Sequence, residues 1–205
     1  VGVHKYTFPK GEGHILLDLK HGIYNYDGKV LWANLRVEND TLLTGYRITN
    51  GWARVNYTHF AITFSKPIKS YGYQEMKPMA YNGMWRKFNI YRDFPEIGGR
   101  NVVAYFDFDL SDGEPLEVKV ALSPMSASGA LNNLRVETAG RSFDQLRKLA
   151  EQKWEDALSV VEVEGDYDQI CNIYSSLYHT MINPSIYMDY DGTYRGLDHE
   201  IHHAD

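Results

Sequence analysis

The spacing of apolar residues changes once along this chain of 205 residues, after Pro124, and this change constrains the fold more than any other feature. Before it, in the stretch 116–122, leucine and valine occupy every second position. After it, apolar residues from Phe143 to Leu158 recur every three or four positions. A period of two is typical of a half-buried strand, and a period of about 3.6 of a half-buried helix. We therefore expect a chain that is β-rich first and helical afterwards.

Short strands with regular turns between them are expected through about residue 123. Turn-forming pairs such as Asp27-Gly28 and Asn39-Asp40 separate the apolar stretches. Many short strands with this punctuation are typical of an antiparallel β-sandwich. The expected strands are 1–8, 14–19, 29–38, 41–49, 55–64, 68–74, 86–92, 101–110 and 116–122.

Two helices are expected near 143–159 and 167–182. Ser142 and Gln145 have the spacing of a capping box, and Asp166 can cap the second helix. Asn183-Pro184 would end that helix. The predicted fold class is mainly β with C-terminal helices, and the separation of strands from helices indicates two domains joined between residues 124 and 165.

An aromatic-rich stretch from 72 to 100, which includes Tyr81 and Trp85, interrupts the strand pattern. Long insertions of this kind are usually binding loops or interfaces. The whole chain has sixteen tyrosines and four tryptophans. Aromatic rings cover the apolar face of a sugar well, but they are also good strand formers, so composition alone leaves both explanations open.

Several classes of function are disfavoured by the sequence. The net charge is −6 and the basic residues form no stripe, which argues against a nucleic-acid partner. No apolar run approaches the ~20 residues of a membrane span. The single cysteine, Cys171, lies at the spacing of a helix core, so we expect a buried structural thiol.

Two acidic stretches resemble metal sites without matching one. The stretch 189–192 lacks the later ligands of a calcium loop, so an Asp-Gly turn is expected there. The stretch 198–205 is rich in histidine and acid but does not have the His-Glu-x-x-His spacing. No metal site is assigned within the chain. Two classes stay open from the residues alone: a carbohydrate-binding module, and the non-catalytic domain of a glycosidase, which the helices favour.

The order and spacing of several motifs resemble glycoside hydrolase family 92, the calcium-dependent exo-acting α-mannosidases. The motifs span nearly the whole chain. They are Val3-His4-Lys5-Tyr6-Thr7-Phe8-Pro9, Gly51-Trp52-Ala53, Phe64-Ser65-Lys66-Pro67, the Ser128–Leu134 stretch, 143–158, Tyr174-Ser175-Ser176-Leu177-Tyr178-His179, Pro184, and Asp191-Gly192-Thr193-Tyr194-Arg195-Gly196.

This resemblance implies a β-sandwich, linker helices and the start of a catalytic (α/α)6 barrel. Residues 1–141 would be the later part of the sandwich, 142–165 the helical linker, and 166–205 the first part of the barrel. The parent would be an inverting α-mannosidase of the α-1,2 type that acts on α-mannoside glycans and is secreted or periplasmic. The catalytic residues and the calcium ligands would lie in the rest of the catalytic domain, downstream of Asp205. This fragment would then be inactive alone.

Four residues are candidates for contact with substrate. Tyr194 and Arg195 follow the first expected barrel helix, so we expect them near the sugar pocket. An alternative for Arg195 is a structural ion pair with Asp191 or Asp198, and the sequence does not decide between the two. Tyr81 and Trp85 are expected to pack against the barrel or to line the rim of its pocket.

Overall fold

The structure is a computed structural model that describes residues 1–22, 26–74, 94–183 and 185–204. These residues form two compact units. One contains Val1–Ala139 together with Met188–Asp205, and the other is Gly140–Tyr187. The strand expected at 86–92 lies outside the described residues.

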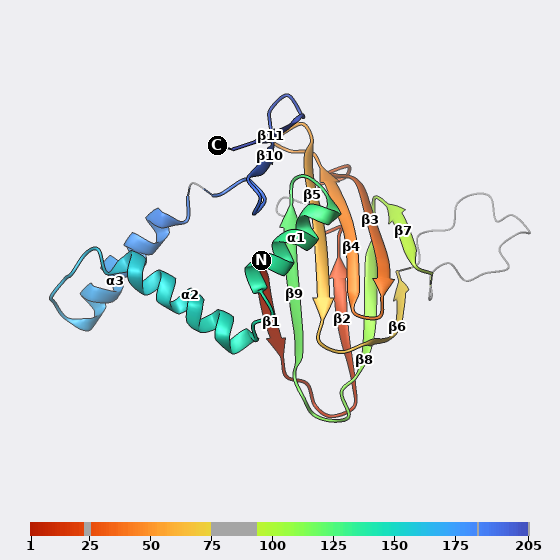
Figure 1. The fold of residues 1–205 in the computed structure, drawn as a ribbon, viewed down its shortest axis with the longest axis horizontal. Helices are drawn as coiled ribbons and strands as arrows, with labels where there is room; N and C mark the ends of the chain where they lie inside the picture. The colour runs from red at the N-terminus through yellow and green to blue at the C-terminus, as the bar shows by residue number, and fades with distance from the viewer. Residues whose placement is uncertain (23–25, 75–93, 184, 205) are drawn as a thin grey trace, which may run out of the picture. The chain divides into compact units, whose positions relative to one another are not determined.

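Two antiparallel sheets make up most of the first unit (Figure 1). The six-stranded sheet has the order β1-β9-β5-β4-β3-β7, and the three-stranded sheet has the order β2-β8-β6. A short hairpin of β10 and β11 belongs to the same unit. The strands are β1 (Gly2–Tyr6), β2 (Glu12–Asp18), β3 (Val30–Asn39), β4 (Leu42–Thr49), β5 (Asn56–Phe64), β6 (Ile68–Tyr73), β7 (Glu96–Gly99), β8 (Val103–Asp109), β9 (Leu116–Ser123), β10 (Thr193–Arg195) and β11 (Ile201–His203).

The main hydrophobic core lies between the two sheets. Phe106 and Phe108 of β8 are fully buried, and both rings contact Phe64 of β5, with centroids 6.0 and 4.9 Å away. Residues between these positions point out of the sandwich, as the period of two requires. The prediction of an antiparallel sandwich followed by helices is confirmed.

Helix α1 (Ala127–Thr138) crosses the outer face of the six-stranded sheet over β9 and β5 (Figure 1). It packs on Ala61 and Ala121, which are completely buried and leave room for a close approach. The sequence analysis did not predict this helix. Half of its buried positions are polar, namely Asn133 and Thr138, so the apolar period that identifies a helix is missing.

Both predicted helices are confirmed in the second unit, as α2 (Phe143–Leu158) and α3 (Tyr167–Met181). Ser142 and Gln145 form the expected capping box. Strand β7 was not predicted, because Gly98 and Gly99 leave it without a β pattern.

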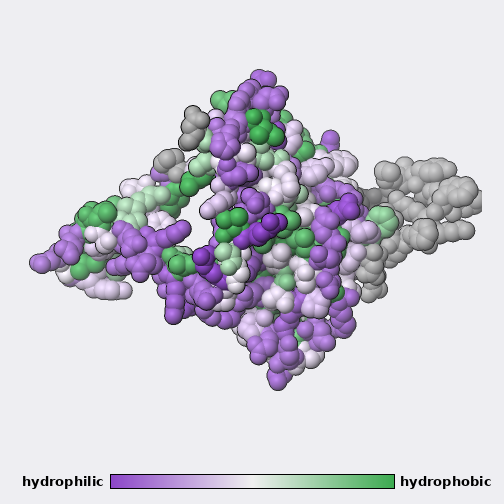
Figure 2. Space-filling view, viewed as in Figure 1, coloured by the Kyte–Doolittle hydropathy of each residue, from purple (hydrophilic) through white to green (hydrophobic). Residues whose placement is uncertain are grey.

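The helix pair keeps much of its apolar surface exposed. All residues of α2 and α3 are described, and neither helix buries one of them completely. The rings of Trp154 and Tyr178 contact each other in a tilted arrangement at a centroid distance of 4.6 Å, and both stay partly exposed. Figure 2 shows apolar side chains at the surface of this pair. Cys171 is only partly buried, less than predicted.

Among the described helices we found none that combines the length and the apolar character needed to cross a bilayer.

Replacing Phe106 with alanine should lower the free energy of unfolding by about 3–5 kcal/mol, because it removes a ring from the centre of the sandwich. Tyr105→Ala on the outer face of the same strand is the matched control and should cost clearly less. Urea unfolding of the purified chain measures both. Equal losses would show that the core does not lie where we place it.

Candidate functional site

The structure places two of the four predicted contact residues, Tyr194 and Arg195, on β10 in the first unit. The ring of Tyr194 stacks on His202 of β11, with centroids 5.5 Å apart. Tyr81 and Trp85 lie outside the described residues. The four candidates are therefore not brought together as one site by the described part of the chain.

The guanidinium of Arg195 binds backbone carbonyl groups at the junction between β9 and α1. Its Nε donates to the carbonyl of Pro124 at 3.2 Å, and Nη2 donates to that of Met125 at 3.4 Å. Its Nη1 donates to the carbonyl of His199 at 2.8 Å, and the group lies 5.0 Å from the centre of the Tyr57 ring. Within the described residues the hydrogen-bond partners of Arg195 are these carbonyls, which differ from the ion pair with Asp191 or Asp198 that the sequence left open as one alternative.

A buried carboxylate, Asp189, stands at the centre of the same region. Only 3% of the residue is exposed. Its Oδ2 accepts a hydrogen bond from the Ser123 hydroxyl at 2.6 Å, and its Oδ1 accepts one from Asn133 Nδ2 at 2.9 Å. Both oxygens are thus engaged, as a buried charge requires.

The partners of Asp189 are themselves fixed by the backbone. Asn133 Oδ1 accepts from the N–H of Tyr190 at 2.8 Å, so the asparagine binds two successive residues of the returning segment. Ser123 Oγ accepts from the N–H groups of Met125 and Ser126. The network therefore joins the end of β9, the helix α1 and the segment before β10.

Asp189 also lies against the first turn of α1. A Cβ atom on Gly129 would come within 2.3 Å of Asp189 Oδ2 and 2.8 Å of Ser123 Oγ, so only glycine allows this approach. The first turn of α1 has no acidic residue of its own. A carboxylate supplied from elsewhere in the chain complements the positive end of the helix dipole.

The local turn confirms the prediction for residues 189–192. The N–H of Gly192 donates to the Asp189 carbonyl at 2.9 Å, and Gly192 has a φ of 83°, which favours glycine. The Asp191 carboxylate accepts from the backbone and hydroxyl of Thr193, which lowers the pKa of Asp191. This tight turn directs the chain into β10.

His59, on the strand next to Ser123, is the titratable group that the network most affects. Burial lowers the pKa of His59, and the charge of Arg195 lowers it further. A hydrogen bond with the Ser123 backbone and the charge of Asp189 act in the opposite direction. The net result is a pKa of His59 below its ordinary value, with burial as the largest cause.

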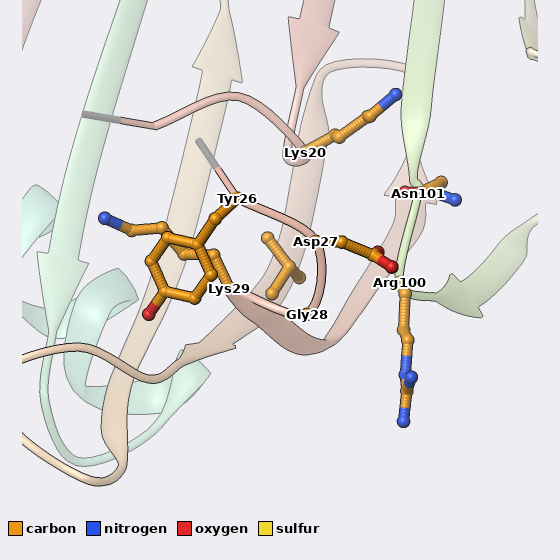
Figure 3. Close-up of a pocket in the computed structure, with 8 residues that line it drawn as sticks. Lys20, Tyr26, Asp27, Gly28, Lys29, Arg100 and Asn101 are labelled. Atoms are coloured by element: carbon orange, nitrogen blue, oxygen red, sulfur yellow. The ribbon is translucent and has the colours of Figure 1, made fainter. Parts of the chain in front are cut away.

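A separate cavity of about 320 Å³ opens between the β2–β3 connection and the β7–β8 connection (Figure 3). Lys20, Lys29 and Arg100 are among its lining residues, together with Asp27 and Tyr26. Figure 3 shows the three basic side chains pointing in different directions. They therefore do not form a convergent anion site, and we assign no ligand to this cavity.

The described residues bring together no group of three or more histidine, cysteine, aspartate or glutamate side chains that could hold a metal ion. Asp198 and His202 form a pair, with Nε2 2.9 Å from Oδ2, at the exposed end of the hairpin. Two ligands of this kind do not fit calcium, which takes about 6–8 oxygen ligands. This pair therefore does not form a calcium site.

Asp189→Asn should destabilise the first unit by about 1–3 kcal/mol, because an amide N–H₂ faces either a donating asparagine or a serine oxygen that already accepts two bonds. Asp191→Asn is the matched control, because an asparagine keeps the turn, and it should change stability by less than about 0.5 kcal/mol. Thermal unfolding of the purified chain compares the two. Equal effects would remove the central role of Asp189.

Gly129→Ala should destabilise the protein although alanine is the better helix former by about 1 kcal/mol. The methyl group would push against Asp189 Oδ2 and Ser123 Oγ. Ser128→Ala, one residue earlier in the same turn and exposed, serves as the control. If Gly129→Ala stabilises the chain as propensity alone predicts, Asp189 does not lie against the helix.

Known proteins resemble this chain over nearly its full length. Two family models match it: the glycosyl hydrolase family 92 N-terminal domain over residues 1–123, and the glycosyl hydrolase family 92 catalytic domain over residues 129–205. A search of the curated proteins found no match.

Solved structures of the same family superpose closely on the chain. The GH92 α-mannosidase BT3965 from Bacteroides thetaiotaomicron has 34% sequence identity and a TM-score of 0.85, over 99% of this chain and 27% of that chain. The GH92 inverting mannosidase BT2199 from Bacteroides thetaiotaomicron VPI-5482 has 25% identity and a TM-score of 0.79, over 98% of this chain and 26% of that chain. The chain thus spans about a quarter of the length of these enzymes.

The N-terminal family model alone covers more than half of the chain, and the catalytic family model covers most of the remainder. Together with the fold, these matches show that the chain belongs to glycosyl hydrolase family 92.

Proposed function

We propose that this chain is part of an α-mannosidase that releases mannose from α-mannoside glycans. The observation that carries the proposal is the match of both family models in sequence order, joined to 34% identity with the α-mannosidase BT3965 over 99% of the chain. A structure of BT3965 in complex with mannoimidazole adds support for a mannose-type substrate.

The finer proposal is an exo-acting, inverting enzyme of the α-1,2 type. Support for inversion comes from BT2199, a related enzyme described as an inverting mannosidase. Inverting hydrolysis needs a carboxylic acid that protonates the leaving oxygen and a carboxylate that activates water on the opposite face. The two groups stand about 6.5–9.5 Å apart to leave room for the water.

Two aspartates among the described residues are engaged in hydrogen bonds within the fold. Both oxygens of Asp189 accept hydrogen bonds, and Asp107 pairs with His14 Nδ1 at 2.6 Å and accepts from Ser70 Oγ at 2.6 Å. We therefore propose that the acid, the base and the calcium ligands come from parts of the enzyme outside these residues. The chain would supply the sandwich, the linker helices and the first part of the catalytic domain, and it would be inactive alone.

Three further points stay proposals. The boundaries 1–141, 142–165 and 166–205 are those we assign in the intact enzyme. Tyr194 and Arg195, with Tyr81 and Trp85, are proposed to face the sugar pocket or its rim. Two N–H groups of Arg195 would have to serve that purpose, because the others bind carbonyl oxygens. The third proposal is that the intact enzyme is secreted or periplasmic, where it would meet glycan substrates directly.

The intact enzyme should release mannose from α-1,2-linked mannobiose faster than from the α-1,3 and α-1,6 isomers. Proton NMR recorded during the first minutes should show β-mannose as the first product, because inversion of an α-linkage gives the β-anomer. Chelation of calcium should abolish turnover, and calcium but not magnesium should restore it. The purified 205-residue chain should give no product under the same conditions.

Each of these expected results can be contradicted by a specific measurement. An α-anomer as first product would contradict inversion, and unchanged activity in chelator would contradict the calcium proposal. Turnover by the 205-residue chain itself would show that the acid and base lie within it.

A further inference from the structure

The outer face of the three-stranded sheet presents one aromatic ring beside a row of polar side chains. Side chains alternate between the two faces of a strand, so Phe106 of β8 points into the core and Tyr105 points outward. Leu16 of β2 and Gly72 of β6 pair with Tyr105 from its two sides. These three residues therefore form one row across the outer face.

The ring of Tyr105 rests on the backbone of the neighbouring strand. A Cβ atom at Gly72 would come within 2.3 Å of Tyr105 Oη and 2.5 Å of its Cζ, so only glycine leaves room for the ring. Tyr105 remains 37% exposed, and Leu16 beside it is 69% exposed. The sheet thus offers a ring whose position is fixed before a ligand arrives, which lowers the entropy cost of stacking on it.

A polar row follows two residues further along the strands, about 7 Å away. His14 Nδ1 lies 2.6 Å from Asp107 Oδ1, and the hydroxyl of Ser70 donates to Asp107 Oδ2 at 2.6 Å. An ionised carboxylate only accepts hydrogen bonds, so Nδ1 carries the proton and Nε2 of the neutral imidazole is an acceptor. The side chain of His14 is 66% exposed, which leaves it within reach of a ligand.

We propose that this face binds an α-mannoside glycan, with one sugar ring stacked on Tyr105. The inference rests on the proposed function, because it takes the glycans of the intact enzyme as the ligand. The C–H groups of a pyranose ring contact the aromatic face, and the tyrosine hydroxyl adds a polar tip. Leu16 covers one edge of the sugar, and a sugar hydroxyl donates to His14 Nε2.

The chemistry of the face fits a neutral glycan better than a protein or a nucleic acid. Leu16 and Tyr105 are the large apolar side chains that β2, β6 and β8 expose, and all residues of these strands are described. Two such side chains are too few for a stable protein interface, which buries about 800 Å² on each partner around an apolar centre. The carboxylates of Glu12, Asp107 and Asp109 on the same face would repel phosphate groups.

Electrophoresis of the intact enzyme through native gels that contain α-linked mannan tests the proposal. Mannan slows a protein that binds it, and the dependence of mobility on mannan concentration gives the Kd. Tyr105→Ala should raise the Kd about tenfold, because it removes the stacking surface. Tyr105→Phe is the matched control, because it keeps the ring, and it should change the Kd by less than about threefold.

A second variant, His14→Ala, tests the polar row separately. It should raise the Kd by about threefold to tenfold, because one hydrogen bond to the sugar is lost. The melting temperature and the release of mannose from α-1,2-linked mannobiose are measured for each variant and should stay unchanged for His14→Ala. Because the gel reports binding whether or not mannose is released, failure of this proposal can be distinguished from failure of the proposed function.

Three results would overturn the proposal. Mannan that does not slow the native enzyme would show that the enzyme does not bind this glycan. Equal mobility of the native enzyme and the Tyr105→Ala variant at every mannan concentration would show that the ring is not the platform. If Tyr105→Ala also lowers the melting temperature, the His14→Ala variant decides, and an unchanged Kd in that variant would remove the site from this face.

Discussion

The buried carboxylate of Asp189 is the interaction on which the arrangement of the first unit depends. It accepts hydrogen bonds from Ser123 at the end of β9 and from Asn133 within α1, although it lies more than fifty residues beyond both. A buried carboxylate without these partners would cost several kcal/mol, so the network favours one arrangement of three segments. Gly129 makes that arrangement possible because it leaves room for the carboxylate.

This network explains how the segment Met188–Asp205, which follows the helix pair, can belong to the same compact unit as the sandwich. Arg195 strengthens the attachment by binding the carbonyls of Pro124 and Met125, where β9 gives way to α1. The sandwich thus holds the hairpin that carries Tyr194 and Arg195 in a fixed place within the first unit.

The sequence was sufficient to predict the strands and helices in which apolar residues recur at a regular period. The strand at 116–122 and the helix after the Ser142 capping box were predicted closely, since period and capping are local properties. Helix α1 was missed because Asn133 and Thr138 occupy buried positions that a pattern search reserves for apolar residues. Asp189 was read only as part of an Asp-Gly turn, because its partners are distant in sequence. The motif containing Tyr194 and Arg195 was one of several whose order and spacing together indicated the family, but it could not show that Arg195 would bind backbone carbonyls.

A double-mutant cycle between Asn133 and Asp189 tests the central claim most directly. Each residue is replaced by alanine singly and together, and the free energy of unfolding of the purified chain is measured in urea. If the two side chains hold α1 and the returning segment together, their coupling energy should reach about 1–3 kcal/mol. Effects that add to within about 0.5 kcal/mol would contradict the account.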